Sequence, residues 1–288
     1  MCKYMKKKFV YIIVLCIIAV CFIWIAYENT ALEVNEYSIA SENIPDAFDG
    51  YRIAHVSDLH NTEFGKENEN LLNILRTMEP DIIAITGDLI DSRNTNIEIA
   101  LEFAKEAMEI APCYYVTGNH EARISEYENL KQGMEALGVI ILENKKIELE
   151  RDGELITLFG VDDPDFNDDY LDVEESVLME SRLEEMISDE DGYRILLSHR
   201  PELFSVYAKY DMDLVLSGHA HGGQFRLPFV GGILAPHQGF FPKYDAGLFE
   251  EDGTTLIVSR GIGNSLFPFR LNNPPEVILI ELKTKPFL

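Results

Sequence analysis

The chain has 288 residues and a formal net charge of −26 at pH 7, and its length allows one large domain with a sizeable buried core. The four N-terminal lysines raise that total, so the part after Tyr27 carries −30. The electrostatic field of so acidic a domain repels nucleic-acid phosphates, and the sequence has no stripe of basic residues to bind them. Together these two features exclude nucleic acid as a partner.

The N-terminal segment predicts a membrane anchor. Lys3 and Lys6-Lys7-Lys8 precede an uncharged stretch over residues 9–27, which is 19 residues long. At about 1.5 Å of rise per residue, this stretch nearly spans a hydrocarbon core of about 30 Å. Acidic residues follow it, so the positive-inside rule places the N-terminus in the cytoplasm and the following domain on the extracellular face of the cell membrane. A cleaved signal peptide is the alternative, but Trp24-Ile25-Ala26-Tyr27-Glu28 offers no small-x-small cleavage site, which favours an uncleaved single-pass anchor within residues 1–30.

Residues 31–288 alternate between short apolar runs and amphipathic segments, a pattern typical of α/β layering. Strands are predicted at residues 32–40, 51–57, 81–86, 113–117, 139–142, 155–161, 193–198, 214–217, 255–259 and 276–282. Helices are predicted at residues 68–78, 96–110, 127–137, 174–187 and 201–209. Neither a repeat nor a linker divides this part, so residues 31–288 are predicted to form one domain. Its single cysteine, Cys113, excludes a disulfide within it.

Five short polar blocks stand at the ends of these apolar runs, and four of them contain histidine. In chain order they are Asp58-Leu59-His60, Gly87-Asp88-Leu89-Ile90-Asp91, Gly118-Asn119-His120-Glu121, Ser198-His199-Arg200-Pro201 and Gly218-His219-Ala220-His221-Gly222-Gly223. Side chains from distant stretches converge at strand ends, and imidazoles together with carboxylates chelate divalent metals. Each block alone is weak evidence, but the five in this order predict a metal centre.

With these blocks the sequence resembles the calcineurin-like metallophosphoesterase family, over residues 52–224 and beyond. The tail, with Ser259-Arg260-Gly261-Ile262-Gly263 and Asn273-Pro274-Pro275-Glu276, resembles the membrane-associated bacterial YkuE-like branch. The resemblance implies an α/β fold: a four-layer αββα sandwich of two mixed β-sheets flanked by helices, following the N-terminal transmembrane helix.

The resemblance also implies a role for each block. Asp58, His60 and His221 would hold one metal, Asn119, His199 and His219 the second, and Asp88 would bridge both. A carboxylate suits the bridging position because its two oxygens can span ions about 3.5–4 Å apart. His120 would stabilise the leaving oxygen, with Asp91 orienting its imidazole, and glycines 87, 118 and 218 would permit sharp turns that aim the ligands.

The predicted activity is hydrolysis of a phosphate ester or pyrophosphate by a metal-activated hydroxide, with two divalent ions drawn from Mn, Fe, Zn or Co. The substrate would be a phosphorylated small molecule or lipid, and tethering to the membrane favours a lipid or cell-envelope precursor. The alternatives are a nucleotide phosphodiesterase and a non-enzymatic scaffold of the same fold. A rim made locally basic by Arg226, Lys243 and Arg270 would reconcile the acidic domain with an anionic lipid.

Other residues receive plainer interpretations. His55 is expected to be a packed core residue. His237 is expected to have no chemical role, with a place on the rim of the site as the alternative. Arg200 is expected either to touch a phosphate or to sit at a helix start beside Pro201. The acidic run over residues 162–169 is expected to form a solvated loop. The aromatic residues of the last third are expected to form a minor core, with lipid contact as the alternative: Phe225, Phe229, Phe240, Phe241, Tyr244, Phe267 and Phe269.

Overall fold

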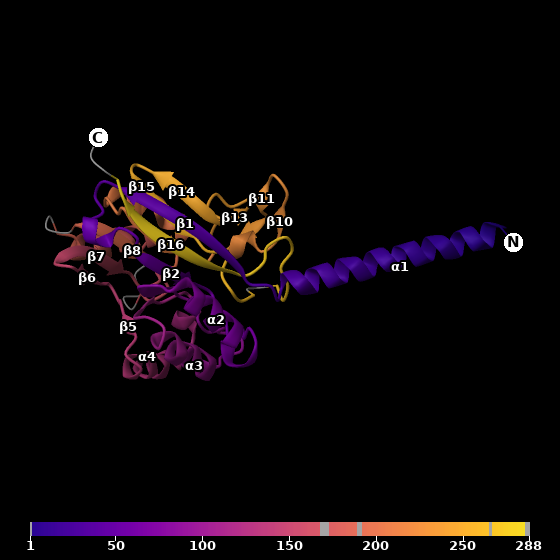
Figure 1. Ribbon diagram of the computed structural model, residues 1–288, viewed down its shortest axis with the longest axis horizontal. Helices are drawn as coiled ribbons and strands as arrows, with labels where there is room; N and C mark the ends of the chain where they lie inside the picture. Colours follow the sequence, from indigo (N-terminus) through magenta and orange to yellow (C-terminus); the bar gives the residue numbers. More distant parts are fainter. Residues whose placement is uncertain (1, 168–172, 189–191, 265–266, 286–288) are drawn as a thin grey trace.

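The computed structural model describes residues 2–167, 173–188, 192–264 and 267–285. Helix α1 (Cys2–Glu28) projects away from all the other elements, as Figure 1 shows. Within it, Lys7–Glu28 is long and apolar enough to cross a membrane, and its apolar side chains are not buried against the rest of the described chain, although Glu28 at its end is buried. The apolar surface of α1 therefore has no partner within the described structure.

The rest of the described chain is built on two six-stranded mixed sheets. In the first sheet, β1 runs parallel to β16, β16 runs antiparallel to β2, and β2 to β5 are parallel to one another. Its strands, in spatial order, are β1 (Glu33–Ser41), β16 (Glu276–Thr284), β2 (Arg52–Val56), β3 (Ile82–Thr86), β4 (Cys113–Val116) and β5 (Ile140–Ile141).

The second sheet has a parallel centre flanked by an antiparallel strand on each edge. Its strands, in spatial order, are β14 (Gly247–Glu251), β15 (Thr254–Val258), β9 (Leu214–Ser217), β8 (Tyr193–Leu197), β7 (Glu154–Gly160) and β6 (Lys145–Arg151). The central strands are buried along nearly their whole length, which explains why they read as continuous apolar runs.

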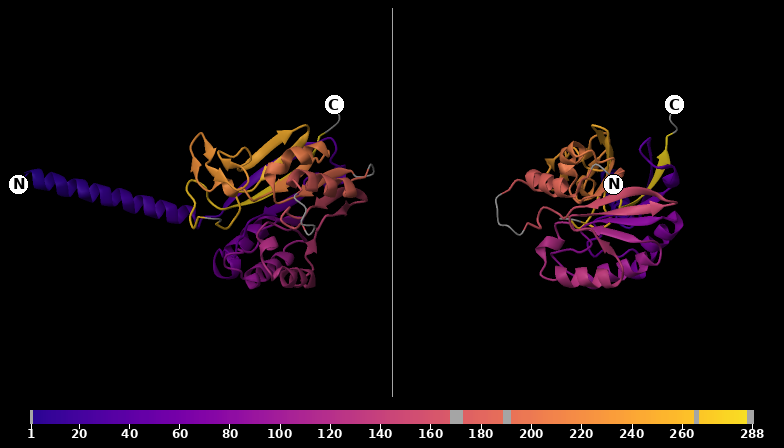
Figure 2. Two further views of the ribbon diagram at one scale, coloured as in Figure 1. Left: turned by 180° about the vertical axis from the view of Figure 1, so that it is seen from behind. Right: turned by 90° about the vertical axis from the view of Figure 1, so that its left-hand side faces the viewer.

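Three apolar cores bind these sheets and helices into four layers (Figures 1 and 2). The first sheet packs outward on α2 (Glu69–Met78), α3 (Ile97–Met108) and α4 (Tyr127–Ala136). The second packs outward on α5 (Glu175–Met186) and α6 (Phe204–Lys209). The middle core joins the two sheets face to face, with residues such as Ile53, Ile278, Leu197 and Leu216. The predicted four-layer αββα sandwich is confirmed.

The elements that the sequence pattern missed are edge strands and short hairpins. β6 and β14 both contain charged residues because one face of each is solvent-exposed, so neither reads as an apolar run. The segment between β9 and β14 forms two small hairpins, β10 (Arg226–Leu227) with β11 (Gly231–Gly232) and β12 (Leu234–Ala235) with β13 (Gly239–Phe240). These hairpins lie at the end of the domain where α1 joins it (Figures 1 and 2).

Candidate dinuclear metal site

All seven predicted metal ligands come together at the ends of five central strands. Asp58 and His60 follow β2, Asp88 follows β3, and Asn119 follows β4. The second sheet contributes the rest, which are His199 after β8, and His219 and His221 after β9. All seven are buried, and the two carboxylates are almost fully so. Buried carboxylates and imidazoles without a counter-charge are costly, so this arrangement needs a compensating cation.

The ligand atoms form two clusters that share Asp88. The first cluster contains Asp58, His60, Asp88 and His221, and the second contains Asp88, His199 and His219. Within each cluster, the ligand atoms lie within 4.8 Å of one another. Asp88 Oδ2 lies 3.5 Å from His60 Nε2 and 3.2 Å from His199 Nε2. The sequence assigned the bridging position to this residue, and its placement between the clusters is the geometry that a bridging carboxylate needs.

Imidazole nitrogens face one another at short range within each cluster. His60 Nε2 lies 3.2 Å from His221 Nε2, and His219 Nδ1 lies 3.1 Å from His199 Nε2. The Asn119 carboxamide lies against the same nitrogen of His219, where its amide nitrogen can donate to Nδ1 at 2.8 Å. A shared cation satisfies the facing imidazole nitrogens, so the donor set fits two metal ions.

Hydrogen bonds with neighbouring backbone and side-chain groups fix the orientation of two of the ligands. His199 Nδ1 lies 2.7 Å from the carbonyl oxygen of Thr86, which can only accept, so Nδ1 carries a proton and the neutral ring would direct the lone pair of Nε2 toward the cluster. Asp58 Oδ2 accepts hydrogen bonds from Ser57 Oγ at 2.7 Å and from the N–H of His219 at 3.0 Å. The orientation of these ligands is therefore set before any ion binds.

Five of the seven ligands adopt positive φ angles that non-glycine residues rarely use. The residues are Asp58 (54°), His60 (47°), Asp88 (52°), His219 (64°) and His221 (48°). Such backbone strain costs about 1–3 kcal/mol per residue and persists where the surroundings over-determine it, as at binding sites. Its concentration on the predicted ligands is independent support for a functional centre.

The three flanking glycines serve two different purposes. Gly87, with φ of 84°, adopts the left-handed conformation that a sharp turn of the predicted kind requires. Gly118 and Gly218 instead allow close approach, because a Cβ at Gly118 would lie 2.2 Å from Asp88 Oδ1 and one at Gly218 would lie 2.2 Å from Asp58 Oδ2. These two glycines make room for the ligand carboxylates.

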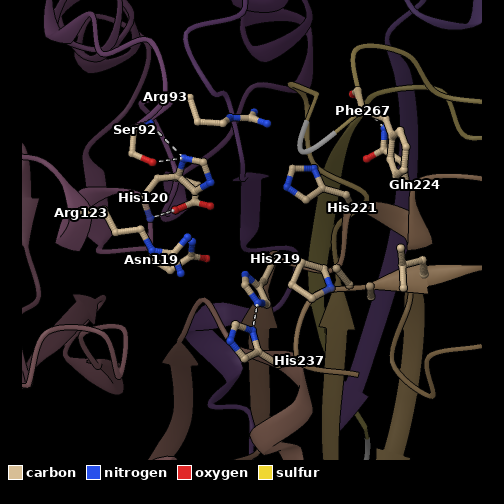
Figure 3. A pocket seen from close by; sticks show the side chains of 15 residues that line it. Ser92, Arg93, Asn119, His120, Arg123, His219, His221, Gln224, His237 and Phe267 are labelled. Carbon is tan, nitrogen blue, oxygen red and sulfur yellow. Dashed lines mark hydrogen bonds between the residues drawn. The ribbon is translucent and has the colours of Figure 1, made fainter. Parts of the chain in front are cut away.

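The structure orients His120 differently from the sequence-based expectation. Its Nδ1 accepts the backbone N–H of Ser92 at 3.0 Å, with the Ser92 hydroxyl at 3.1 Å (Figure 3). Asp91 lies farther away, at 3.6 Å, and its carboxylate is held by two hydrogen bonds from Arg93. An Nδ1 that accepts an N–H carries no proton, so His120 is neutral with its proton on Nε2. Burial, which lowers the pKa of His120 to about 4, favours the same form.

Glu121 is a site residue that the sequence analysis did not single out. Its fully buried carboxylate accepts the N–H groups of Asp88 at 2.9 Å, Gly118 at 2.8 Å and Ile90 at 3.3 Å. It thereby joins the loop after β3 to the loop after β4. Burial and the nearby Asp88 raise the pKa of Glu121 to about 7. The signal was present in the sequence, since a carboxylate directly follows the Asn119-His120 pair.

Arg200 faces inward. Its side chain is fully buried, and it donates to Asp163 at 2.6 and 2.8 Å and to His237 Nδ1 at 2.8 Å. His237 Nδ1 also lies 2.9 Å from His219 Nε2, so His237 contacts a predicted ligand, contrary to the expectation that it has no chemical role. This contact leaves His219 Nδ1 directed at the second cluster.

Two other expectations have mixed outcomes. His55 is a fully buried core residue as predicted, bonded to Thr86 Oγ1 at 2.8 Å, and burial lowers its pKa to about 4. The acidic run is not a simple solvated loop, because Asp162 and Asp163 are buried and Asp163 binds Arg200. Residues 168 and 169 of that run lie outside the described residues.

Comparison with known proteins identifies the family. Residues 51–223, more than half of the chain, match the family described as calcineurin-like phosphoesterase. The chain belongs to this family. The uncharacterized metallophosphoesterase YkuE of Bacillus subtilis is 33% identical over 266 residues, which cover 89% of this chain and 87% of YkuE. Phosphodiesterase YaeI of Escherichia coli is 26% identical over 81% of this chain and 82% of its own.

A solved structure supports the fold of this calcineurin-like phosphoesterase. TT1561 of Thermus thermophilus superimposes with a TM-score of 0.51 at 16% identity, covering 74% of this chain and 90% of its own. Family membership confirms the predicted enzyme class, a metal-dependent phosphoester hydrolase, and the resemblance on which that prediction rested.

A cavity of about 360 Å³ opens beside the two clusters of the phosphoesterase. Arg93 and Arg123 lie on the side of His120, and Gln224 and Phe267 lie across the cavity beyond His221 (Figure 3). The cavity is therefore cationic on one side and partly apolar on the other. This division suits a phosphate group attached to an apolar body.

The basic rim expected at Arg226, Lys243 and Arg270 is not what the structure shows. Arg270 is buried and donates to backbone carbonyls, while Arg226 and Lys243 are paired with Asp245 and Glu251. None of the three lines the described cavity. Arg93 and Arg123 line it instead, each paired with a carboxylate, Asp91 and Asp165 respectively.

Proposed function

We propose that this chain is a membrane-anchored phosphoesterase with two divalent metal ions, which hydrolyses a phosphodiester or pyrophosphate carried by a lipid or cell-envelope precursor. The observation that carries the proposal is the placement of Asp88 between two clusters of buried ligands. The filled ligand positions argue against a non-enzymatic scaffold of the same fold.

In this proposal, Asp58, His60 and His221 hold one ion, and Asn119, His199 and His219 hold the other, with Asp88 shared. Two ions held there supply Lewis acidity and make hydroxide available near neutral pH. Mixed oxygen and nitrogen donors suit Mn, Fe, Zn or Co, and metal availability selects among them.

The side chains around the clusters have separate roles. His120 donates its Nε2 proton in a hydrogen bond to a substrate oxygen, because Ser92 keeps Nδ1 in the accepting form. Asp91 supports this corner of the cavity by holding Arg93. Arg93 and Arg123 attract the phosphate charge at the cavity mouth, where two guanidinium groups offset the negative field of the rest of the domain.

The location of the enzyme follows from the anchor. Residues 1–30 carry the lysine cluster and the transmembrane helix, and residues 31–288 form the catalytic domain. The lysines keep the N-terminus in the cytoplasm, which places the catalytic domain on the extracellular face. One helix that can span a membrane supports this arrangement. A tethered site meets its substrate at the bilayer surface, which favours a lipid-linked phosphate over a soluble nucleotide.

The test uses the full chain, purified from membranes in detergent. Bound metals are measured by atomic spectroscopy, and turnover of p-nitrophenyl phosphate and bis-p-nitrophenyl phosphate is measured with Mn²⁺. About two metals per chain and preferential turnover of the diester are expected. Asp88→Asn should lose metal and more than about 100-fold in turnover, because loss of even an outer-shell partner costs about 10–100-fold. Asp152→Asn, in an exposed turn, is the matched control.

Each outcome separates the alternatives. A chain that binds no metal and turns over neither ester would overturn the enzyme proposal in favour of the scaffold. Turnover of soluble nucleotide esters that exceeds turnover of detergent-dispersed phospholipid would favour the nucleotide phosphodiesterase instead.

A further inference from the structure

Large apolar side chains are exposed on the two small hairpins and the loop beside α1. Phe229, in the turn between β10 and β11, is fully exposed, and Phe240 and Phe241 are 73% and 63% exposed. We define the hairpin patch as the exposed apolar residues of these segments: Leu227, Phe229, Val230, Phe240, Phe241 and Phe269. Soluble surfaces rarely concentrate such side chains, so the patch indicates an interaction site.

The hairpin patch is attached directly to the end of α1. The Asn29 side chain accepts the N–H of Arg270 at 2.7 Å and donates to the Arg270 carbonyl at 3.1 Å. The same loop joins β10, because the N–H of Arg226 donates to the carbonyl of Leu271 at 2.9 Å. Both ribbon views place the hairpins at the end of the domain from which α1 projects (Figures 1 and 2). A bilayer crossed by α1 would therefore lie against this end.

The charge of the segments around the patch also fits a bilayer surface. Residues 224–247 and 261–275 together carry three cationic side chains and one carboxylate, and the carboxylates of Glu251 and Glu28 lie against them, so these segments and their partners are close to neutral, whereas the chain after Tyr27 has a net charge of −30. A face without excess negative charge can approach anionic headgroups, which would repel the rest of the domain.

The patch continues into the wall of the catalytic cavity. The ring of Phe225 lies 5.1 Å from that of Phe267 and 5.4 Å from that of Phe269. Gln224 ties these two residues together by donating to the carbonyls of Phe267 at 3.3 Å and Phe269 at 2.8 Å. Since Phe267 lines the cavity and Phe269 is exposed, an apolar path connects the outer surface to the site.

We infer that the hairpin patch inserts into the interfacial region of the bilayer that α1 enters, so that the cavity receives phosphate groups of molecules embedded in that bilayer. This inference rests on the proposed anchor and deepens the proposed function by naming a lipid as the substrate class. The partner is the lipid surface itself, because the patch is contiguous with the helix that would cross it. Exposed phenylalanines that enter this zone bury their rings among acyl chains.

The experiment uses the full chain in vesicles of phosphatidylcholine with brominated acyl chains, which quench tryptophan on contact. Trp24, in α1, is the single tryptophan of the chain, so Trp24→Phe provides a dark background. Phe229→Trp in that background reports on the patch. Leu155→Trp, an exposed apolar position in β7 at the other end of the domain, is the matched control. Unbrominated vesicles give the reference intensity.

We expect brominated lipid to quench Phe229→Trp at least severalfold more than Leu155→Trp. Equal quenching of the two would overturn the inference, as would no quenching at Phe229→Trp while Trp24 of the unaltered chain is quenched. Absence of quenching at Trp24 would overturn both the anchor and the docking. None of these results depends on turnover, so failure of the phosphoesterase assay is distinguishable from failure of the docking.

Discussion

Glu121 offers a sharp test of how the site is assembled, because one buried carboxylate joins two ligand loops. Its oxygens accept the N–H groups of Asp88, Gly118 and Ile90. Replacing it with glutamine keeps the shape and removes the charge. One amide oxygen can still accept the bonds from Asp88 and Gly118, but the new amide nitrogen faces the N–H of Ile90, which cannot accept a hydrogen bond.

The expected loss follows from these three bonds. A charge-assisted hydrogen bond contributes about 1.5–3 kcal/mol and a neutral one about 0.5–1.5 kcal/mol, while an orphaned buried donor costs about 1–3 kcal/mol. If the carboxylate of the parent is fully ionised, two weakened hydrogen bonds and one unsatisfied N–H together lower the free energy of unfolding by about 3 kcal/mol. Burial and Asp88 raise the pKa of Glu121 to about 7, so the fold disfavours the ionised carboxylate, and removing its charge offsets part of this loss. The free energy of unfolding should therefore fall by only about 1–2 kcal/mol.

The assay is urea unfolding of the metal-free full chain in detergent, with metal titration in parallel. Metal affinity should also fall by about 10–100-fold, because Glu121 positions Asp88 without touching the ions. Glu128→Gln, on the exposed face of α4, is the matched control and should change stability by less than about 0.5 kcal/mol. Parental stability and two tightly bound metals in Glu121→Gln would refute the reasoning.

Three further perturbations follow from the same geometry. Arg200→Met should lower the free energy of unfolding by about 3–5 kcal/mol in urea, because it leaves Asp163 as an unpaired buried charge; a stability equal to the parent would contradict this account. Gly118→Ala should release metal and abolish diester turnover without unfolding the domain, since its Cβ would lie 2.2 Å from Asp88 Oδ1; two bound metals by atomic spectroscopy would count against it. Arg123→Ala should raise KM for bis-p-nitrophenyl phosphate about fivefold to tenfold, which is less than a buried charge-assisted hydrogen bond contributes because the Arg123 side chain is exposed to solvent. A fall in kcat alone would show that Arg123 does not act in substrate binding.

The sequence pattern predicted the central strands well because they are buried on both faces, whereas the sandwich arrangement was implied by the resemblance to the family. Strands such as β3 and β9 appear as apolar runs, and their ends coincide with the polar blocks. The edge strands β6 and β14 escaped because solvent covers one face of each, so their charged residues hide the strand pattern. The small hairpins escaped for a related reason, since each of their strands has only two residues.

The chemistry around the metal ligands was less predictable than the ligands themselves. Asp91 was the expected partner of His120, but the main chain turns so that the N–H of Ser92 reaches Nδ1 first. A backbone donor leaves no signature in a sequence. Likewise, Arg226, Lys243 and Arg270 are cationic residues near the site in sequence, but their side chains are occupied by Asp245, Glu251 and backbone carbonyls.

By itself, then, the sequence determined which residues could chelate metal, which runs form the buried strands, and which helix can enter a membrane. Each of these depends only on residue composition, on the order of the motifs along the chain, or on the local spacing of apolar residues. Only the tertiary structure decided that Glu121 ties two loops together, that Ser92 binds Nδ1 of His120, and that the β10–β11 hairpin shares the end of the domain with α1. These facts depend on contacts between segments far apart in the chain, where the position of one side chain is set by the packing of two sheets and their loops.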